Sequence, residues 1–229
     1  MLYELRSYDV HSPRSLAALT QRFADHTIPI WSRMGIEPVG FWSVFAGTPI
    51  SRLTYLLAWE DLAQRQALWD AFTSDPEWKQ ALAESETRGN PVRGISSAIL
   101  KPTPASRLPH ADNQPARLSG GVFELHSYAF DAAAKLQQAL AWFGEIGQPQ
   151  MEKHGIYVMG QWTTYIGVSP RLTVMLVFES LAHRERAWAS FLTDPAWPAL
   201  ESGLYPNDRY LISQTESWLM RGTEFSGWR

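Results

Sequence analysis

Apolar and polar residues alternate at the start of the chain, from Leu2 to Val10, and this period of two predicts a β-strand. Tyr3 and Leu5 share one face of that strand. The residues expected on the opposite face are Glu4, Arg6 and Tyr8. The apolar face suits contact with helices, so the polar face is expected to point away from them.

A helical pattern follows the strand. Ser12 and Pro13 supply an N-cap and a first-turn proline, and Leu16, Leu19 and Phe23 then recur at helical spacing. The helix is expected to bend or stop near Pro29. In the second half of the chain, the corresponding cap is expected at Asp131.

Two runs rich in aromatic and β-branched residues, 39–45 and 53–59, flank a Gly-Thr-Pro turn and predict a β-hairpin. A second helix is expected over 61–72, and Asp75-Pro76 is typical of a cap that opens a further short helix. A last strand is expected at 95–100. The order β-α-β-β-α-β is typical of the ferredoxin-like fold.

The whole pattern is written twice. Tyr3-Glu4-Leu5-Arg6-Ser7-Tyr8 returns as Phe123-Glu124-Leu125-His126-Ser127-Tyr128, and residues 52–78 return as 171–197 with 13 of 27 positions identical. A repeat of this length is a whole domain. The sequence therefore predicts a first domain over 1–101, a Pro-rich linker over 102–120 and a second domain over 121–229.

The open face of each expected sheet must also be covered. The third strand is apolar on both of its faces, as in the run Leu53 to Trp59, which is typical of a strand covered on both sides. The predicted fold class is α+β: two ferredoxin-like βαββαβ domains packed sheet to sheet as an intrachain dimeric α/β barrel. Residues between the two sheets would line its lumen.

Composition narrows the function classes. The chain of 229 residues has no cysteine, which excludes disulfides and a cysteine nucleophile. A net charge of −3 without a Lys/Arg block argues against nucleic-acid binding. No leader pattern and no long apolar run is present, so no membrane partner and a cytoplasmic location are expected.

At the repeated residues the chain resembles the NIPSNAP family, within the dimeric α/β-barrel superfamily. The resemblance depends on the motif from Tyr3 to Tyr8, on His26 and Pro29, and on Gly40-Phe41-Trp42, together with Gly47, Arg65 and Asp75-Pro76-Glu77-Trp78. It covers both copies and implies ferredoxin-like halves paired through their sheets. It implies a protein that binds a small molecule or another protein and whose role is unsettled. Relatives in the superfamily include cofactor-free monooxygenases, isomerases and haem enzymes.

The two copies differ in their polar residues. At the positions equivalent to His26, Arg6 and Met34, the second copy has Ile146, His126 and His154. Tyr55 and Val174 stand where the resemblance implies a histidine. Any pocket is therefore expected to be asymmetric.

The candidate catalytic residues are His126, Arg6 and His26: a histidine as proton-transfer group and an arginine that stabilises an oxyanion. The candidate ligand-binding residues are Glu4, Tyr8, Trp42, Tyr55, Glu124, Tyr128 and Trp162. No metal site and no cofactor are expected, because no two histidines have ligand spacing on one element. No closely spaced Ser/His/Asp set is present either.

Structural roles compete with these functional ones. Glu4 with Arg6, and Glu124 with His126, can form ion pairs that only stabilise the fold. Gly40 can be a packing site for the ring of Trp42. Arg65 and Arg184 are expected to pair with acids at the start of their helices.

Three functions remain open. The first is binding of a small hydrophobic or aromatic molecule in the lumen. The partners considered with it are this small-molecule ligand and further copies of the pseudo-dimer, in a homo-oligomer. The second is a cofactor-independent monooxygenase or isomerase that uses the same lumen. The third is a structural or interaction protein without a pocket.

Overall fold

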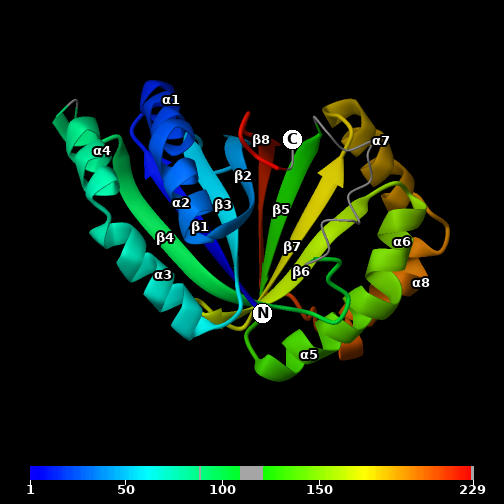
Figure 1. Cartoon of the computed structure of the whole chain (residues 1–229). Coiled ribbons are helices and arrows are strands. Elements are labelled where there is room, and N and C mark those ends of the chain that lie inside the picture. Colours follow the sequence, from blue (N-terminus) through cyan, green and yellow to red (C-terminus); the bar gives the residue numbers. More distant parts are fainter. Residues whose placement is uncertain (88, 109–120, 228–229) are drawn as a thin grey trace. The chain divides into compact units, whose positions relative to one another are not determined.

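The computed structural model describes residues 1–87, 89–108 and 121–227 and has an α+β architecture (Figure 1). It divides into two compact units. The first comprises Met1–Ile99 and the segment that begins at Gly222, and the second comprises Leu100–Arg221.

The first unit follows the predicted order of strands and helices. Its elements are β1 (Leu2–Val10), α1 (Pro13–Arg22), the π-helical turn η1 (Phe23–Thr27), α2 (Ile28–Met34), β2 (Glu37–Ala46), β3 (Arg52–Trp59), α3 (Leu62–Ser74), α4 (Pro76–Thr87) and β4 (Val92–Pro102), whose last residues belong to the second unit. The strand expected from the alternation at Leu2 to Val10 is confirmed.

The second unit repeats this order. Its elements are β5 (Val122–Ala129), α5 (Ala133–Trp142), the π-helical turn η4 (Phe143–Gly147), α6 (Gln148–Lys153), β6 (Tyr157–Ile166), β7 (Arg171–Phe178), α7 (Leu181–Leu192), α8 (Trp197–Glu201), the 3₁₀ turns η5 (Ser202–Leu204) and η6 (Pro206–Asp208), and β8 (Gln214–Gly222).

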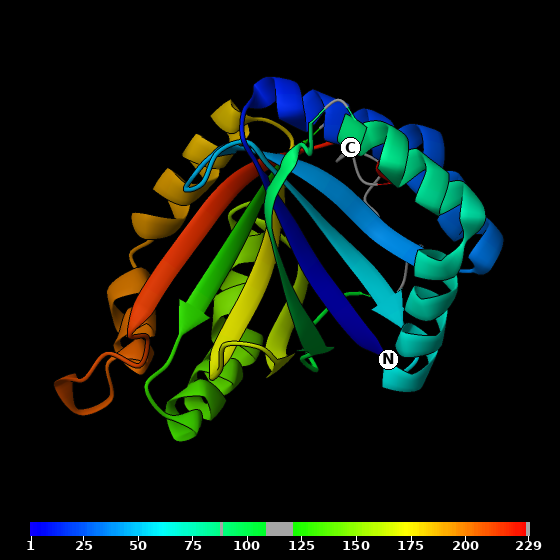
Figure 2. The same ribbon diagram turned by 90° about the vertical axis from the view of Figure 1, so that its left-hand side faces the viewer.

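The sheet of the first unit is antiparallel around β3, which pairs with β1 on one side and β2 on the other. β4 lies next to β1. In the second unit β5 pairs with β7 and β8, and β6 pairs with β7. Within the first unit, α1 to α4 cover one face of the sheet (Figures 1 and 2).

Both faces of β3 are buried, as its sequence predicts. Leu53 and Leu57 belong to a core with Phe23, Trp31 and other residues of the helices, while Leu56, on the opposite face, is only 1% exposed. That the two sheets face each other stays a prediction.

The helix caps agree with the sequence only in part. Ser12 and Asp75 accept hydrogen bonds from the backbone N–H groups of Ser15 and Trp78, as expected of N-caps. Asp131 was wrongly expected to cap α5: the N-cap is Ala132, and Asp131 instead pairs with Lys135 at 2.9 Å.

The helix does not stop at Pro29, but its hydrogen-bond pattern changes just before this residue. The backbone stays right-handed helical through Thr27 and Ile28, and in the π-helical turn η1 the Ile28 N–H donates to the Phe23 carbonyl, directly before the proline, which has no N–H to donate. The helix ends instead at Gly35, whose φ of 77° is left-handed and favours glycine.

Part of the predicted linker is structured. The N–H of Thr103 donates to the carbonyl of Gln161, and the Ser106 hydroxyl accepts from the N–H of Gln161. The same two bonds recur in the first unit, where Thr223 and Ser226 hold Phe41. The repeat therefore extends to Thr103 and Ser106, and residues 109–120 of the predicted linker lie outside the described part of the chain.

Candidate functional site

The Glu4 carboxylate is the centre of a buried polar cluster under α3. It accepts two hydrogen bonds from Arg65, both at 2.8 Å, and one each from the indoles of Trp59 and Trp69 at 3.2 and 3.0 Å. Ser97 on β4 donates a further bond at 2.8 Å. Burial alone would raise the pKa of Glu4, but these donors, with Arg6, outweigh it and lower the pKa to about 2. Glu4 is therefore a buried, ionised and fully hydrogen-bonded group.

Arg6 joins this cluster to two tyrosines. It donates to Glu4 at 3.0 Å, to the hydroxyl of Tyr55 at 2.9 Å and to that of Tyr8 at 3.3 Å, and it lies over the ring of Trp69 at 4.7 Å. Burial would lower the pKa of Arg6, yet the tyrosines and Glu4 raise it above its usual value. The guanidinium is thus engaged on all sides by the protein itself.

The second unit repeats the arrangement around Glu124. Arg184 donates two hydrogen bonds of 2.6 Å to this carboxylate and Trp188 donates one of 3.1 Å. His126 Nε2 lies 3.0 Å from Glu124, and His126 Nδ1 lies 3.1 Å from the Tyr128 hydroxyl. Burial would raise the pKa of Glu124, but His126 and Arg184 lower it to about 2.

These contacts correct two predictions. The polar face of β1, with Glu4, Arg6 and Tyr8, lies under the helices rather than away from them, because α3 supplies Arg65 and Trp69 as partners. The same holds for Glu124, with Arg184 and Trp188 of α7. Arg65 and Arg184 pair with these strand glutamates and not with acids at the start of their own helices. The predicted lumen lining is therefore wrong for these strand residues.

Trp42 and Trp162 lie on the other face of their sheets. Both are buried, with exposed fractions of 0% and 1%. A Cβ atom added at Gly40 would stand 2.7 Å from the Trp42 ring, so the glycine exists to admit the indole. The structure thus shows that each glycine makes room for an indole, while a ligand-binding role for Trp42 and Trp162 stays a prediction.

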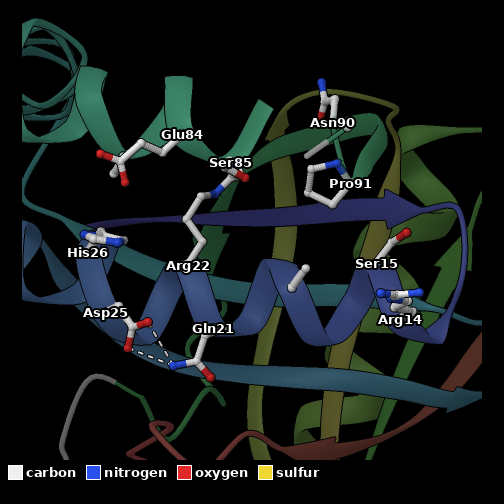
Figure 3. A pocket seen from close by; sticks show the side chains of 13 residues that line it. Arg14, Ser15, Gln21, Arg22, Asp25, His26, Glu84, Ser85, Asn90 and Pro91 are labelled. Carbon is white, nitrogen blue, oxygen red and sulfur yellow. Dashed lines mark hydrogen bonds between the residues drawn. The ribbon is translucent and has the colours of Figure 1, made fainter. Parts of the chain in front are cut away.

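His26 lines a groove of about 860 Å³ between α1, η1 and α4 of the first unit (Figure 3). Arg14, Gln21 and Asp25 lie along one side of it, and Glu84, Ser85 and Asn90 along the other. Arg22 extends from α1 across the groove toward Ser85 of α4, as Figure 3 shows. The groove brings His26 together with Arg22. Arg22 was not among the residues predicted from the sequence.

Arg22 is a buried cation without a carboxylate partner among the described residues. It is only 8% exposed, donates to Ser85 at 3.2 Å and lies over the ring of Trp78 at 5.6 Å. Its Nε is buried and has no hydrogen-bond acceptor in the described structure. Burial lowers the pKa of Arg22, and only more distant groups such as Tyr8 and Glu86 oppose this. Such a group normally requires an anion.

The second copy shows what this position looks like without the cation. At the shared offset of 120, Trp142 replaces Arg22, Ala134 replaces Arg14 and Ile146 replaces His26. Trp142 is 6% exposed, and its indole donates to the carbonyl of Leu200 at 2.9 Å. An apolar residue therefore fills this position well, and the first copy carries a charged group where the fold does not require one.

A second cluster missed from the sequence lies in the second unit. His154 contacts Asp194 and Ser190 at 2.8 Å each, although these residues stand 40 and 36 positions away in the chain. The sequence holds no closely spaced Ser/His/Asp set, and these three residues come together only in the fold. The only sequence signal is that the first copy has Met34 and Ala71 at the places of His154 and Ser190.

Among the described residues, no group of three or more acidic, histidine or cysteine side chains is arranged to hold a metal ion. No helix in this part of the chain is both long and apolar enough to cross a membrane.

The family model named NIPSNAP matches the chain twice, over residues 3–107 and 123–227. The chain therefore belongs to the NIPSNAP family, as a tandem duplication. The first match includes Thr103 and Ser106, and the second includes the equivalent residues Thr223 and Ser226. No curated protein matched the chain.

Among solved structures, protein Atu4242 from Agrobacterium tumefaciens is 27% identical, with 47% of this chain and 99% of that chain covered and a TM-score of 0.42. Other solved structures match nearly the whole chain. A putative monooxygenase from Lactobacillus acidophilus is 10% identical, with 100% and 98% covered and a TM-score of 0.57. An anthrone oxidase-like protein is 13% identical, with 98% and 92% covered and a TM-score of 0.57. At such identities the likeness shows the fold alone.

Proposed function

We propose that this protein binds a small anionic molecule in the groove between α1 and α4 of its first unit, which we take to be a ferredoxin-like domain. The observation that carries the proposal is the buried guanidinium of Arg22, which no carboxylate within the described residues neutralises. A ligand carboxylate or phosphate at the Nε of Arg22 would supply the missing acceptor and charge.

The rest of the groove fits a polar ligand of modest size. Arg14 and His26 can add positive charge, while Ser15, Gln21 and Asn90 offer hydrogen-bonding groups. A volume of about 860 Å³ lies within the range of small-molecule sites. The ligand class is therefore more polar than the hydrophobic or aromatic molecule expected from the sequence.

The internal repeat supports a functional reason for Arg22. In the second copy the equivalent residue, Trp142, fills its site with ring packing and one hydrogen bond. A buried, unneutralised cation lowers stability, so packing gives no reason for Arg22 at this position, whereas binding of an anion does.

The test is thermal unfolding of the full chain with phosphate, citrate and benzoate, followed by calorimetric titration of any anion that raises Tm. An anion at 100 times its Kd should stabilise the protein by about 2.7 kcal/mol. Arg22→Met should abolish the shift, while Arg186→Met, which removes the same charge at an exposed site on α7, should leave it unchanged. An equal shift in Arg22→Met, or no shift with any of these anions at millimolar concentration, would overturn the proposal.

A further inference from the structure

A hydrogen-bonded chain of three side chains lies on the second unit, whereas the groove is formed by residues of the first. The Asp194 carboxylate contacts His154 Nε2 at 2.8 Å, and His154 Nδ1 contacts the Ser190 hydroxyl at 2.8 Å. Ser190 lies near the end of α7, Asp194 follows that helix, and His154 terminates α6. An acid, an imidazole and a hydroxyl in this order form the constellation that activates a serine.

The protonation states follow from the partners of Asp194. Its Oδ2 accepts hydrogen bonds from Lys153 at 2.7 Å and Gln150 at 2.8 Å, and its Oδ1 accepts from the N–H of Ala196 at 2.7 Å. Led by Lys153, these donors hold the pKa of Asp194 well below its usual value. Because the carboxylate is ionised, a neutral His154 carries its proton on Nε2, which leaves the Nδ1 lone pair to accept the Ser190 proton.

The base and the nucleophile differ in their exposure to solvent. The side chains of His154 and Asp194 are 10% and 7% exposed, whereas Ser190 is exposed. The ring of Phe191 stands edge-on to the imidazole at 6.0 Å and helps to fix its plane. A reagent can therefore reach the hydroxyl, while the imidazole that would take its proton is held in place.

The first copy shows that the fold does not require this chain. Asp75, the counterpart of Asp194, also accepts a hydrogen bond from a backbone N–H that follows it, that of Trp78 at 3.0 Å, and it pairs with the basic Arg33 at 3.2 Å. A backbone hydrogen bond to this aspartate and an ion pair are thus common to both copies. Only the second copy adds His154 and Ser190, where the first has Met34 and Ala71.

We propose that Ser190 is a nucleophile toward ester or other activated acyl groups, with His154 as its general base and Asp194 as the residue that positions His154. Ser190 Oγ would form a bond to the acyl carbon while the bond to the leaving oxygen breaks. The Ser190 proton would pass to His154 Nδ1 and from there to the leaving oxygen. Water, deprotonated by His154, would then hydrolyse the acyl-serine, release the carboxylic acid and restore the hydroxyl.

The direct test is labelling of the full chain with a fluorophosphonate, in which Ser190 Oγ would form a bond to phosphorus and fluoride would leave. Intact mass and peptide mapping should place the adduct on Ser190. Ser190→Ala and His154→Met, which restore the residue types of the first copy, should lower the labelling rate at least about 100-fold, as expected for loss of nucleophile or base. Ser74→Ala, at an exposed serine that ends α3, should label like the wild type.

A second measurement separates chemistry from structure. With 4-nitrophenyl acetate, the full chain should release a burst of nitrophenolate, and Asp194→Asn should slow this burst about 10-fold or more while circular dichroism confirms that it is folded. Ser190→Ala should lower Tm only slightly, because it removes a single hydrogen bond, the one to His154, at an exposed hydroxyl. Labelling at another residue, or an unchanged labelling rate in His154→Met, would overturn the proposal.

Discussion

The Glu4 carboxylate and the Arg65 guanidinium lie 61 residues apart in the chain and form two hydrogen bonds of 2.8 Å each. Glu124 and Arg184 form the same paired contact in the second unit, at 2.6 Å. In both units the pair joins the first strand to the helix after the third strand. It is therefore a structural element of the repeat, shared by both copies.

Loss of Arg65 should destabilise the first unit strongly. In Arg65→Met the Glu4 carboxylate, whose side chain is fully buried, would lose its bidentate partner, and we expect a loss of about 3–5 kcal/mol in the free energy of unfolding. Denaturation with urea measures this loss. The double variant Glu4→Gln/Arg65→Met should recover part of it, since no unpaired charge then remains buried; equal destabilisation of the single and double variants would contradict this account.

Acid should destabilise the protein through the same carboxylates. The pKa values of Glu4 and Glu124 are lowered from 4.5 to about 2, so the unfolded chain takes up protons before the folded protein does. The stability that these groups contribute is complete above about pH 4.5 and is lost as the pH falls toward about 2. Each contributes roughly 3 kcal/mol. Urea unfolding across this window should show a shallower pH dependence for Glu4→Gln than for the wild type.

Arg22→Met should not destabilise the protein. The substitution removes a buried cation that has Ser85 as its hydrogen-bond acceptor and no carboxylate within ion-pair distance among the described residues, so we expect a gain of roughly 1 kcal/mol. Urea denaturation without added anion measures it. A loss of several kcal/mol would show that Arg22 is a structural group and would weaken the binding proposal.

Gly40→Ala should destabilise the protein by roughly 1–3 kcal/mol, because the new Cβ would stand 2.7 Å from the ring of Trp42. Gly94→Ala is the matched control, since a Cβ atom at Gly94, also in a strand, meets nothing within 4 Å. The two variants should differ in Tm and in the fluorescence of the buried indole. Equal stability of the two variants would contradict this account, since it would mean that the Trp42 ring moves aside without loss of stability.

The order of strands and helices could be predicted because it depends on the alternation of apolar and polar residues, on turn and cap residues, and on their repetition in the second copy. Strand β1, the hairpin of β2 and β3, and the cap at Asp75 follow from them. The sequence misplaced the polar face of β1, since hydrophobicity alone assigns Tyr3 and Leu5 to the helices. The partner that reverses this assignment, Arg65, comes from a distant helix.

The candidate sites were harder to predict. Arg22 follows the buried Leu19 by one helical turn and so lies on the buried face of α1. A charged residue on that face was the sequence signal for this site. His154, Ser190 and Asp194 come from separate elements, and only the tertiary fold brings them together. For both sites, comparison of the two copies shows which residues the fold itself does not require.

The segment that begins at Gly222 completes the first unit, where Ser226 binds the backbone of Phe41 and Phe225 packs on its ring at 5.1 Å. Thr103 and Ser106 do the same for Gln161 in the second unit. A gene cut between the copies would therefore encode two fragments, each missing a piece of its own core that the other carries. Such fragments are expected to be less stable when expressed apart than when expressed together, because each then lacks the segment that caps its own β2 or β6 strand.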